Sequence, residues 1–249
     1  MMKGSKSGVK SSSSTTGIQN VEYYEDIMNG LSERSYRKLA AALLVLGAVL
    51  ANIAFIGLGS VFNYPDILQE PAKEILRQFT INQNAIIFWF GILAIGAGLL
   101  APIAIILGRM GSSRIAVWTG VLAAVVQVIG LSRWLLIVPG LAQKGDVATF
   151  ELLNTILGTI VGETFGYLFT GVWTILIIQS LGKIIGRKWF SWLGIISATL
   201  IMLGLLIPLG VPGTDTANFI GYILWSVWLV ALGVLIWRGV DASKSSNQS

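Results

Sequence analysis

The sequence contains no cysteine and no histidine among its 249 residues. Without cysteine the chain has no disulfide, no thiolate nucleophile and no thiolate metal ligand. Without histidine it also lacks the side chain that most often serves as a general base or a metal ligand near neutral pH. Much of the chemistry that enzymes carry out inside membranes is therefore excluded.

Charged side chains are also scarce, at 12% of the residues against about 25% in a typical soluble domain. Because 54% of the residues are hydrophobic, the chain cannot cover itself with a polar surface, and its surroundings must be lipid. Six apolar runs have the length of about 20 helical residues that crossing a bilayer requires. We therefore predict an all-α polytopic membrane protein with six transmembrane helices. The expected spans are residues 39–62, 84–108, 115–141, 152–181, 189–210 and 217–237.

The formal net charge of +5 comes from basic residues in short segments beside the apolar runs. This distribution is typical of membrane topology and argues against nucleic acid as a partner. Short loops rich in Lys and Arg resist translocation, and ten such residues fall on one side against Lys73, Arg77 and Lys144 on the other. We predict that both termini are cytoplasmic. The ten residues are Arg34, Arg37, Lys38, Arg109, Arg114, Lys183, Arg187, Lys188, Arg238 and Lys244.

The segments outside the spans are short. Residues 1–20 have low complexity and predict a disordered cytoplasmic tail, and residues 239–249 form a second cytoplasmic tail behind the transmembrane domain of residues 39–238. Residues 21–38 favour a juxtamembrane amphipathic helix on the membrane surface, with a solvated linker as the alternative. Between the first two spans we predict an amphipathic helix on the outer surface. Its apolar face consists of Ile67, Leu68, Ile75, Leu76 and Phe79.

Two ionisable residues lie well inside apolar runs, Arg133 in the third span and Glu163 in the fourth. A charge at the centre of a spanning helix costs about 2.5–3.5 kcal/mol on insertion scales. Counted at helical rise from Arg114 and Lys183, the two residues come to the same level, near the outer edge of the hydrocarbon. Consecutive antiparallel helices are normally neighbours, so we predict an intramembrane ion pair. The polar network expected around this pair comprises Gln127, Ser132, Thr164 and Tyr167.

Two kinds of role fit Arg133 and Glu163. The first is structural: the pair is a clamp between helices, or each side chain separately reaches the outer headgroups. The second is functional: the pair lines a polar vestibule that opens outward and orients a ligand. At the start of the last span, Asp215 is expected to be the helix N-cap. A cation site at Asp215 and Asn218 is a weaker alternative, because a single carboxylate is a poor metal site.

Small residues recur every four positions along the fourth span. Such a ridge allows close approach of another helix, which replaces the hydrophobic driving force that lipid does not supply. The partner is either the third span of the same chain or a second protomer, so a homo-oligomer or another membrane protein in contact with the fourth helix is one alternative. The ridge consists of Gly158, Gly162, Gly166, Thr170 and Thr174.

At RWLLIVPGLA (Arg133 to Ala142) and GETFGYLFTGVWTILI (Gly162 to Ile177), the chain resembles the domain of unknown function 4386 family of mostly bacterial integral membrane proteins. The resemblance continues through GTDTANFIGYILWSVWL (Gly213 to Leu229) and covers about residues 35–238. It implies the membrane architecture and brings no established activity. Related sequences often carry histidines in the fourth helix, and their absence here argues against a proton-transfer or metal role.

Two functions fit the sequence. The first is a non-enzymatic structural or accessory component of the plasma membrane, in contact with membrane lipids and without a cofactor or metal. The reason is that no span carries paired carboxylates, a nucleophile with a base, or a metal-ligand cluster. The second is a small-solute transporter or channel whose outward-facing vestibule is lined by Arg133 and Glu163. The expected discriminating feature is whether these side chains face a cavity or a dry helix seam.

Overall fold

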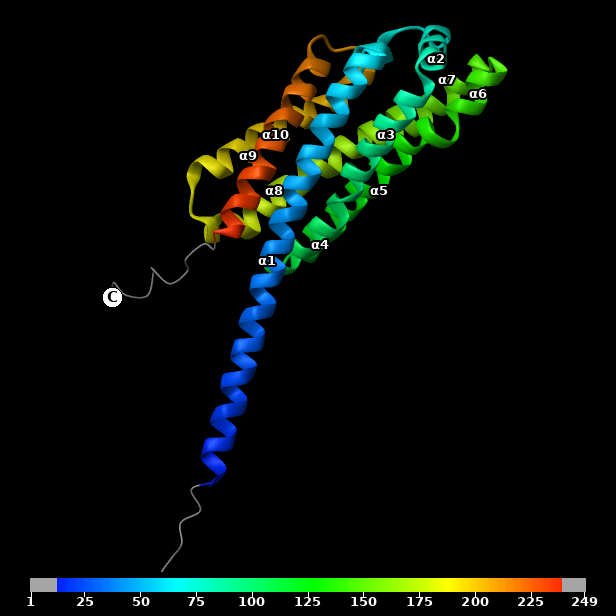
Figure 1. The fold of residues 1–249 in the computed structure, drawn as a ribbon. Helices are drawn as coiled ribbons and strands as arrows, with labels where there is room; N and C mark the ends of the chain where they lie inside the picture. Colours follow the sequence, from blue (N-terminus) through cyan, green and yellow to red (C-terminus); the bar gives the residue numbers. More distant parts are fainter. Residues whose placement is uncertain (1–12, 239–249) are drawn as a thin grey trace, which may run out of the picture. The chain divides into compact units, whose positions relative to one another are not determined.

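The computed structural model describes residues 13–238, which form helices joined by short loops (Figure 1). No strand occurs among these described residues. The elements are α1 (Ser13–Phe62), η1 (Asp66–Gln69), α2 (Ala72–Ile81), α3 (Gln83–Gly98), α4 (Leu100–Met110), α5 (Arg114–Leu136), α6 (Val138–Lys144), α7 (Val147–Leu153), η2 (Asn154–Phe165), α8 (Gly166–Ile185), α9 (Lys188–Leu203), η3 (Gly204–Leu209) and α10 (Thr214–Trp237).

Six helical segments of the described chain are long and apolar enough to cross a membrane, which confirms the predicted number. Five of them contain the apolar run from which they were predicted, and the fifth span ends one residue before its predicted bound of 210. The other bounds differ by a few residues because flanking polar residues extend the helices. The side of the membrane on which the termini lie stays a prediction. The segments are Arg34–Phe62, Gln83–Met110, Arg114–Lys144, Val147–Lys183, Lys188–Leu209 and Thr214–Trp237.

The chain divides into two units, residues 1–39 and residues 40–249. The described part of the first unit is helical throughout. Residues 13–38 belong to α1. The division into a cytoplasmic tail of residues 1–20 and a juxtamembrane amphipathic segment of residues 21–38 stays a prediction. The rest of the expected N-terminal tail, residues 1–12, and the expected C-terminal tail, residues 239–249, lie outside the described residues.

Prolines determine where three of the spans lose regular α-helical structure. Proline has no N–H to donate to the carbonyl four residues earlier. Accordingly, α3 ends four residues before Pro102, α5 ends three residues before Pro139, and α9 passes into the 3₁₀-helix η3 four residues before Pro208. These breaks divide the second and third spans into pairs of helices and give the fifth span a 3₁₀ end.

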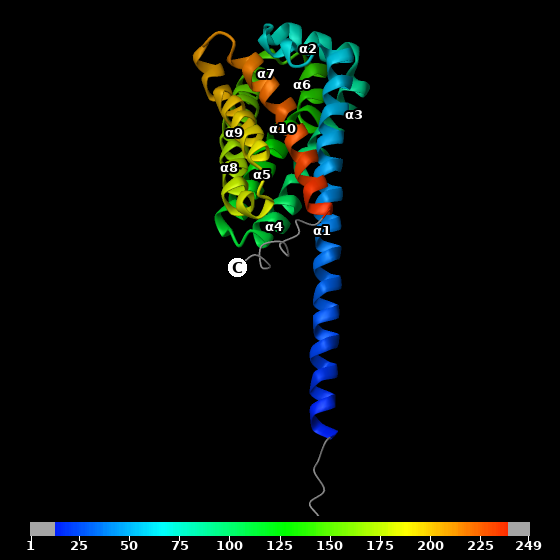
Figure 2. The same cartoon turned by 90° about the vertical axis from the view of Figure 1, so that its left-hand side faces the viewer.

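The helix α2 lies at the same end of the bundle as α6 and α7 (Figure 2). Its apolar face is buried, with Ile75, Leu76 and Phe79 exposing 5% or less, and it packs against α6 and α7. The amphipathic helix predicted between the first two spans is therefore confirmed. The contacts show in addition that this apolar face is covered by protein.

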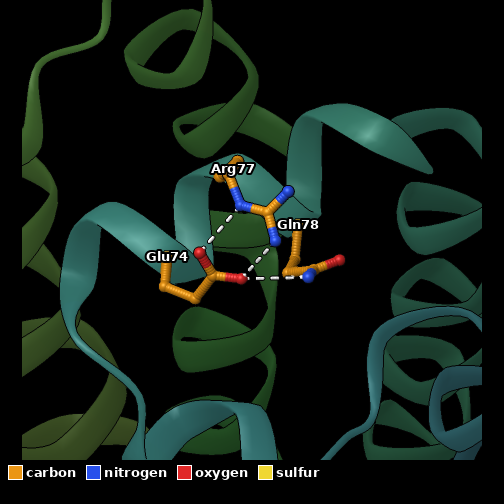
Figure 3. Close-up of polar contacts among 3 residues, drawn as sticks. All are labelled: Glu74, Arg77 and Gln78. Atoms are coloured by element: carbon orange, nitrogen blue, oxygen red, sulfur yellow. Dashed lines mark hydrogen bonds and ion pairs between the residues drawn. The ribbon is translucent and has the colours of Figure 1, made fainter.

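The polar face of α2 carries a small hydrogen-bonded cluster (Figure 3). Arg77 donates from Nε and Nη2 to the two carboxylate oxygens of Glu74, at 2.8 and 2.6 Å, and Gln78 donates to Glu74 Oε1 at 2.9 Å. The hydrogen bonds from Arg77, which have the larger effect, and from Gln78 lower the pKa of Glu74 from 4.5 to about 2. This cluster therefore remains ionised in moderately acidic solution.

The buried side chains of the second unit form two clusters. At the α2 end, Trp134 is the centre of an aromatic cluster: it stacks on Phe90 with centroids 4.8 Å apart, and lies 5.3 Å from Phe62, 5.9 Å from Phe79 and 6.0 Å from Phe150. The cluster at the other end is formed by α1, α4, α5, α8, α9 and α10. Its largest members include Trp173, Ile177, Phe190, Trp228 and Leu232.

Candidate ligand-binding cavity

The fourth span contains a π-helical segment, η2, between α7 and α8. A π-helix makes i→i+5 hydrogen bonds and winds about 4.4 residues per turn, whereas an α-helix winds 3.6. Asn154 and Glu163 are nine residues apart, which is two and a half α-helical turns and would place them on opposite faces. In the π-helix nine residues make about two full turns, so both side chains lie on one face. π-Helices are rare, and most are single-turn π-bulges, which occur frequently at functional sites.

The small-residue ridge of the fourth span packs against α5 of the same chain. A Cβ added to Gly162 would lie 2.9 Å from the Gly130 Cα, and one added to Gly166 would lie 3.0 Å from the Gln127 side chain. Gln127 Nε2 also donates to the buried Thr170 hydroxyl at 3.0 Å. The third span therefore packs against this ridge, and contact of the fourth helix with a second protomer or another membrane protein stays a prediction.

The guanidinium of Arg133 is held by groups of the protein itself. Its Nε donates to Asn154 Oδ1 at 3.2 Å, and its Nη1 donates to the carbonyl of Gly130. Its Cζ lies 5.1 Å from the ring centroid of Trp134, within the range of a cation–π interaction. The missing side chain of Gly158 makes room for it, since a Cβ there would lie 2.6 Å from Nη2.

Arg133 and Glu163 do not form the direct ion pair that we predicted. No hydrogen bond or ion pair joins the Arg133 guanidinium to the Glu163 carboxylate, and the hydrogen bonds of Arg133 go to Asn154 and Gly130. The prediction assumed that Arg114 and Lys183 lie at equal depth, so that counting residues from each would give the levels of Arg133 and Glu163. The two reference residues are not at equal depth. Gly111 closely approaches Ser180, so Lys183 lies about one turn beyond Arg114, and Arg133 faces Gly158 rather than Glu163. The two charges still interact electrostatically through space.

Both charges line a cavity of about 690 Å³ within the second unit. Its walls come from α1, α3, α4, α5, η2 and α10, and its lining is mostly apolar. At the α2 end it is lined by the exposed residues Gln69 and Asp215; at the opposite end it is closed by the buried residues Ile103 and Leu229. Exposed lining residues also occur along the walls, at Ile56 on α1 and at Ile223 on α10. The cavity therefore reaches the surface at the end of the bundle that the basic-residue count predicts to be outside, and also along α1 and α10.

Glu163 is the unusual group in this cavity. Its side chain is partly exposed to the cavity, and no carboxylate hydrogen bond or ion pair to any described residue is present. A carboxylate without partners inside a spanning segment is costly unless water or a ligand satisfies it. This carboxylate therefore indicates that the cavity binds water or a ligand at Glu163.

The remaining residues of the predicted polar network divide into two groups. Gln127 and Tyr167 line the cavity. The hydroxyl of Ser132 instead donates to Ile129 O at 2.8 Å, and that of Thr164 donates to Thr159 O at 2.8 Å, so neither takes part in the cavity lining. Thr164 reaches the carbonyl five residues earlier, which fits the π-helical geometry of this segment.

Several polar cavity residues were missed by sequence reasoning, because they come from distant parts of the chain. Asn218 had been noted, but its amide donates to Ile201 O at 2.7 Å. Asp215 lies in the first turn of α10, and Gly213 is the N-cap, which corrects the N-cap prediction. The sequence signal that could have identified these residues is a tyrosine or asparagine within an apolar run. The additional polar lining residues are Asn52, Tyr64, Asn154, Thr159 and Tyr222.

The described residues offer no group of three or more His, Cys, Asp or Glu side chains that could hold a metal ion. The cavity volume falls in the range of about 300–1,000 Å³ found for small-molecule sites, which are mostly apolar with a few polar groups. The residues present thus fit an organic ligand better than a bare metal ion.

These features define a polytopic α-helical membrane protein with a ligand-sized cavity between its helices. The chain belongs to the family described as "Domain of unknown function (DUF4386)", whose match covers residues 39–233. This confirms the family resemblance found at the third, fourth and sixth spans. Neither the curated proteins nor the solved structures contain a match.

Proposed function

We propose that this protein binds a small amphiphilic molecule in the intramembrane cavity, as a solute-binding or transport protein without a catalytic step. The observation that carries the proposal is the unpartnered carboxylate of Glu163 in a cavity of about 690 Å³. Of the two functions that fit the sequence, a vestibule accounts for this cavity, whereas a structural clamp requires a dry seam and a direct ion pair.

The proposed location is the plasma membrane, with the cavity mouth facing outward and both termini in the cytoplasm. The support is the distribution of Lys and Arg around the spans. In this orientation the exposed Gln69 and Asp215 meet the external solution, and the buried residues Ile103 and Leu229 separate the cavity from the cytoplasm. A transport cycle would require a second state in which this inner barrier opens.

The test uses purified protein in lipid nanodiscs and thermal unfolding against a panel of small amphiphiles. A ligand that binds only the folded state raises the unfolding temperature. Ala97→Phe places a large side chain at the cavity wall, and Ala42→Phe places the same side chain at an exposed position outside the cavity. We expect the stabilisation to be lost in the first variant and kept in the second.

If no amphiphile stabilises the protein, or if both phenylalanine variants respond like the wild type, the binding proposal is wrong. For a ligand that does bind, uptake into proteoliposomes distinguishes transport from binding. Accumulation that Ala97→Phe abolishes indicates a carrier, and binding without uptake indicates a receptor or accessory component.

A further inference from the structure

We propose that the ligand of the cavity is an amphiphilic organic cation, with Glu163 as its counter-ion. This inference rests on the proposed binding function and names the chemical class of the ligand. It follows from the way in which the two charges of the cavity are satisfied. The guanidinium of Arg133 has hydrogen-bond partners within the protein, and the carboxylate of Glu163 has none among the residues that the structure describes.

Arg133 already has its acceptors. Asn154 and the Gly130 carbonyl accept two of its hydrogen bonds, and the face of Trp134 lies against its guanidinium. Only 5% of the residue is exposed. Two of its five N–H groups therefore already have acceptors, and the residue is almost wholly buried, so Arg133 presents less to a ligand than Glu163 does.

Glu163 has the opposite character. It offers two acceptor oxygens to the cavity and no described side chain donates to them. An ammonium or a related cation would supply both the charge and, where it carries N–H groups, the hydrogen bonds that this carboxylate lacks. The same pairing would remove the cost of an unsatisfied charge in a spanning helix.

Three tyrosine rings line the same cavity as the carboxylate. Tyr64, Tyr167 and Tyr222 all line the cavity and lie within electrostatic range of Glu163. Tyr167 and Tyr222 are in contact, with ring centroids 6.0 Å apart, and Trp225 follows at 6.2 Å from Tyr222. Aromatic faces attract organic cations through their quadrupole, so these rings reinforce the preference of Glu163.

The mouth of the cavity carries a negative charge, as Glu163 does inside it. Asp215 is exposed and lines the cavity at its open end, and a carboxylate at a cleft entrance raises the local concentration of cations. A metal ion is disfavoured because the described residues hold no suitable ligand cluster. The mostly apolar walls and the volume of about 690 Å³ instead fit a cation with an organic body.

The test compares probes of nearly equal shape and different charge: tetraphenylphosphonium, tetraphenylborate and neutral triphenylphosphine oxide. Binding to the protein in nanodiscs is measured by equilibrium dialysis, with empty nanodiscs as the blank. We expect the wild type to bind the phosphonium at least about tenfold more tightly than either other probe. Glu163→Gln should weaken phosphonium binding about tenfold or more, and Glu163→Asp should retain part of it.

The matched control is Asp66→Asn, which removes an exposed carboxylate that does not line the cavity and should leave binding unchanged. Unfolding temperatures of all variants separate a binding defect from misfolding. If the three probes bind equally well, if the borate or a zwitterionic amphiphile binds best, or if folded Glu163→Gln binds the phosphonium like wild type, the cation inference is wrong and the cavity proposal stands. If no probe and no amphiphile binds, both proposals are wrong.

Discussion

Gly130 of α5 and Gly162 of the π-helical segment meet backbone to backbone: a Cβ added to Gly130 would lie 2.5 Å from the Gly162 Cα and 2.9 Å from the Leu157 carbonyl oxygen. This contact sets the distance between the third and fourth spans at the level of the cavity. It allows Arg133 on one helix and Glu163 on the other to share the same space.

Gly130→Ala should destabilise the protein, because backbone atoms cannot move aside as a flexible side chain can. Overpacking of this kind typically costs about 1–3 kcal/mol. The measurement is the free energy of unfolding in detergent micelles. Gly140→Ala is the control, since a Cβ there would meet nothing within 4 Å, and it should be neutral or slightly stabilising. Equal effects of the two substitutions would contradict the close approach.

Arg133 and Asn154 should be energetically coupled, since the Arg133 Nε donates directly to the Asn154 side chain. In a double-mutant cycle of Arg133→Leu and Asn154→Ala, we expect a coupling energy of about 0.5–3 kcal/mol. The cycle of Arg133→Leu with Glu163→Gln should give a smaller value, because the two side chains make no direct contact. Thr199→Ala, on α9, serves as the additive control. If the coupling energy of Arg133 with Glu163 were larger than that with Asn154, the result would support a direct ion pair between Arg133 and Glu163.

The π-helical segment makes a prediction about solvent access. Asn154 and Glu163 line the cavity, whereas Ile156 and Phe165, also nine residues apart, are exposed on the outside of the helix, at 42% each. Cysteine reacts as a thiolate and therefore where water reaches it. Single cysteines at 154 and 163 should both react with a hydrophilic thiol reagent, and those at 156 and 165 should both resist.

The natural absence of cysteine means that these variants need no background substitutions. A regular α-helix would place the members of each pair on opposite faces, because nine residues are two and a half turns. Labelling of one member of each pair would therefore show that the segment is α-helical in the membrane.

The Glu74–Arg77–Gln78 cluster makes a prediction about pH. The pKa of Glu74 is lowered from 4.5 to about 2 by its hydrogen bonds from Arg77 and Gln78, so the folded state favours the ionised carboxylate. The resulting stabilisation is fully present above about pH 4.5 and is lost as the pH falls towards about 2. The wild type should melt above Glu74→Gln at pH 6, and the difference should shrink across this window.

Because the cluster is on an exposed helix face, its contribution should be modest and should decrease at high salt. Asp66→Asn, which removes an exposed carboxylate on the same connection, is the charge-matched control. A difference between wild type and Glu74→Gln that grows as the pH falls would contradict the assigned direction.

The number of spans and the amphipathic α2 could be predicted because each depends on a local pattern in the sequence. A run of about 20 apolar residues has few alternatives to a spanning helix, and the spacing of Ile75, Leu76 and Phe79 indicates one buried face. The small-residue ridge at Gly158, Gly162 and Gly166 was also local, and only its partner required the structure.

The details of the cavity could not be predicted for two physical reasons. The π-helical winding changes which residues share a face, so Asn154 and Glu163 lie on one side of the helix, whereas regular α-helical winding would place them on opposite sides. The relative depth of neighbouring helices depends on packing, as at Gly111 and Ser180, and charges at the membrane surface are an inaccurate reference for it. The walls from α1 and α10 are separated from Arg133 by many residues, and no local pattern indicated that they would meet.

The burial of α2 against α6 and α7 has a mechanical consequence. It fastens the connection after the first span to the hairpin between the third and fourth spans, at the mouth of the cavity. The connection between the fifth and sixth spans is instead exposed at residues 209–213. Any movement that widens the cavity at the end of the first span must therefore carry α2, α6 and α7 along with it.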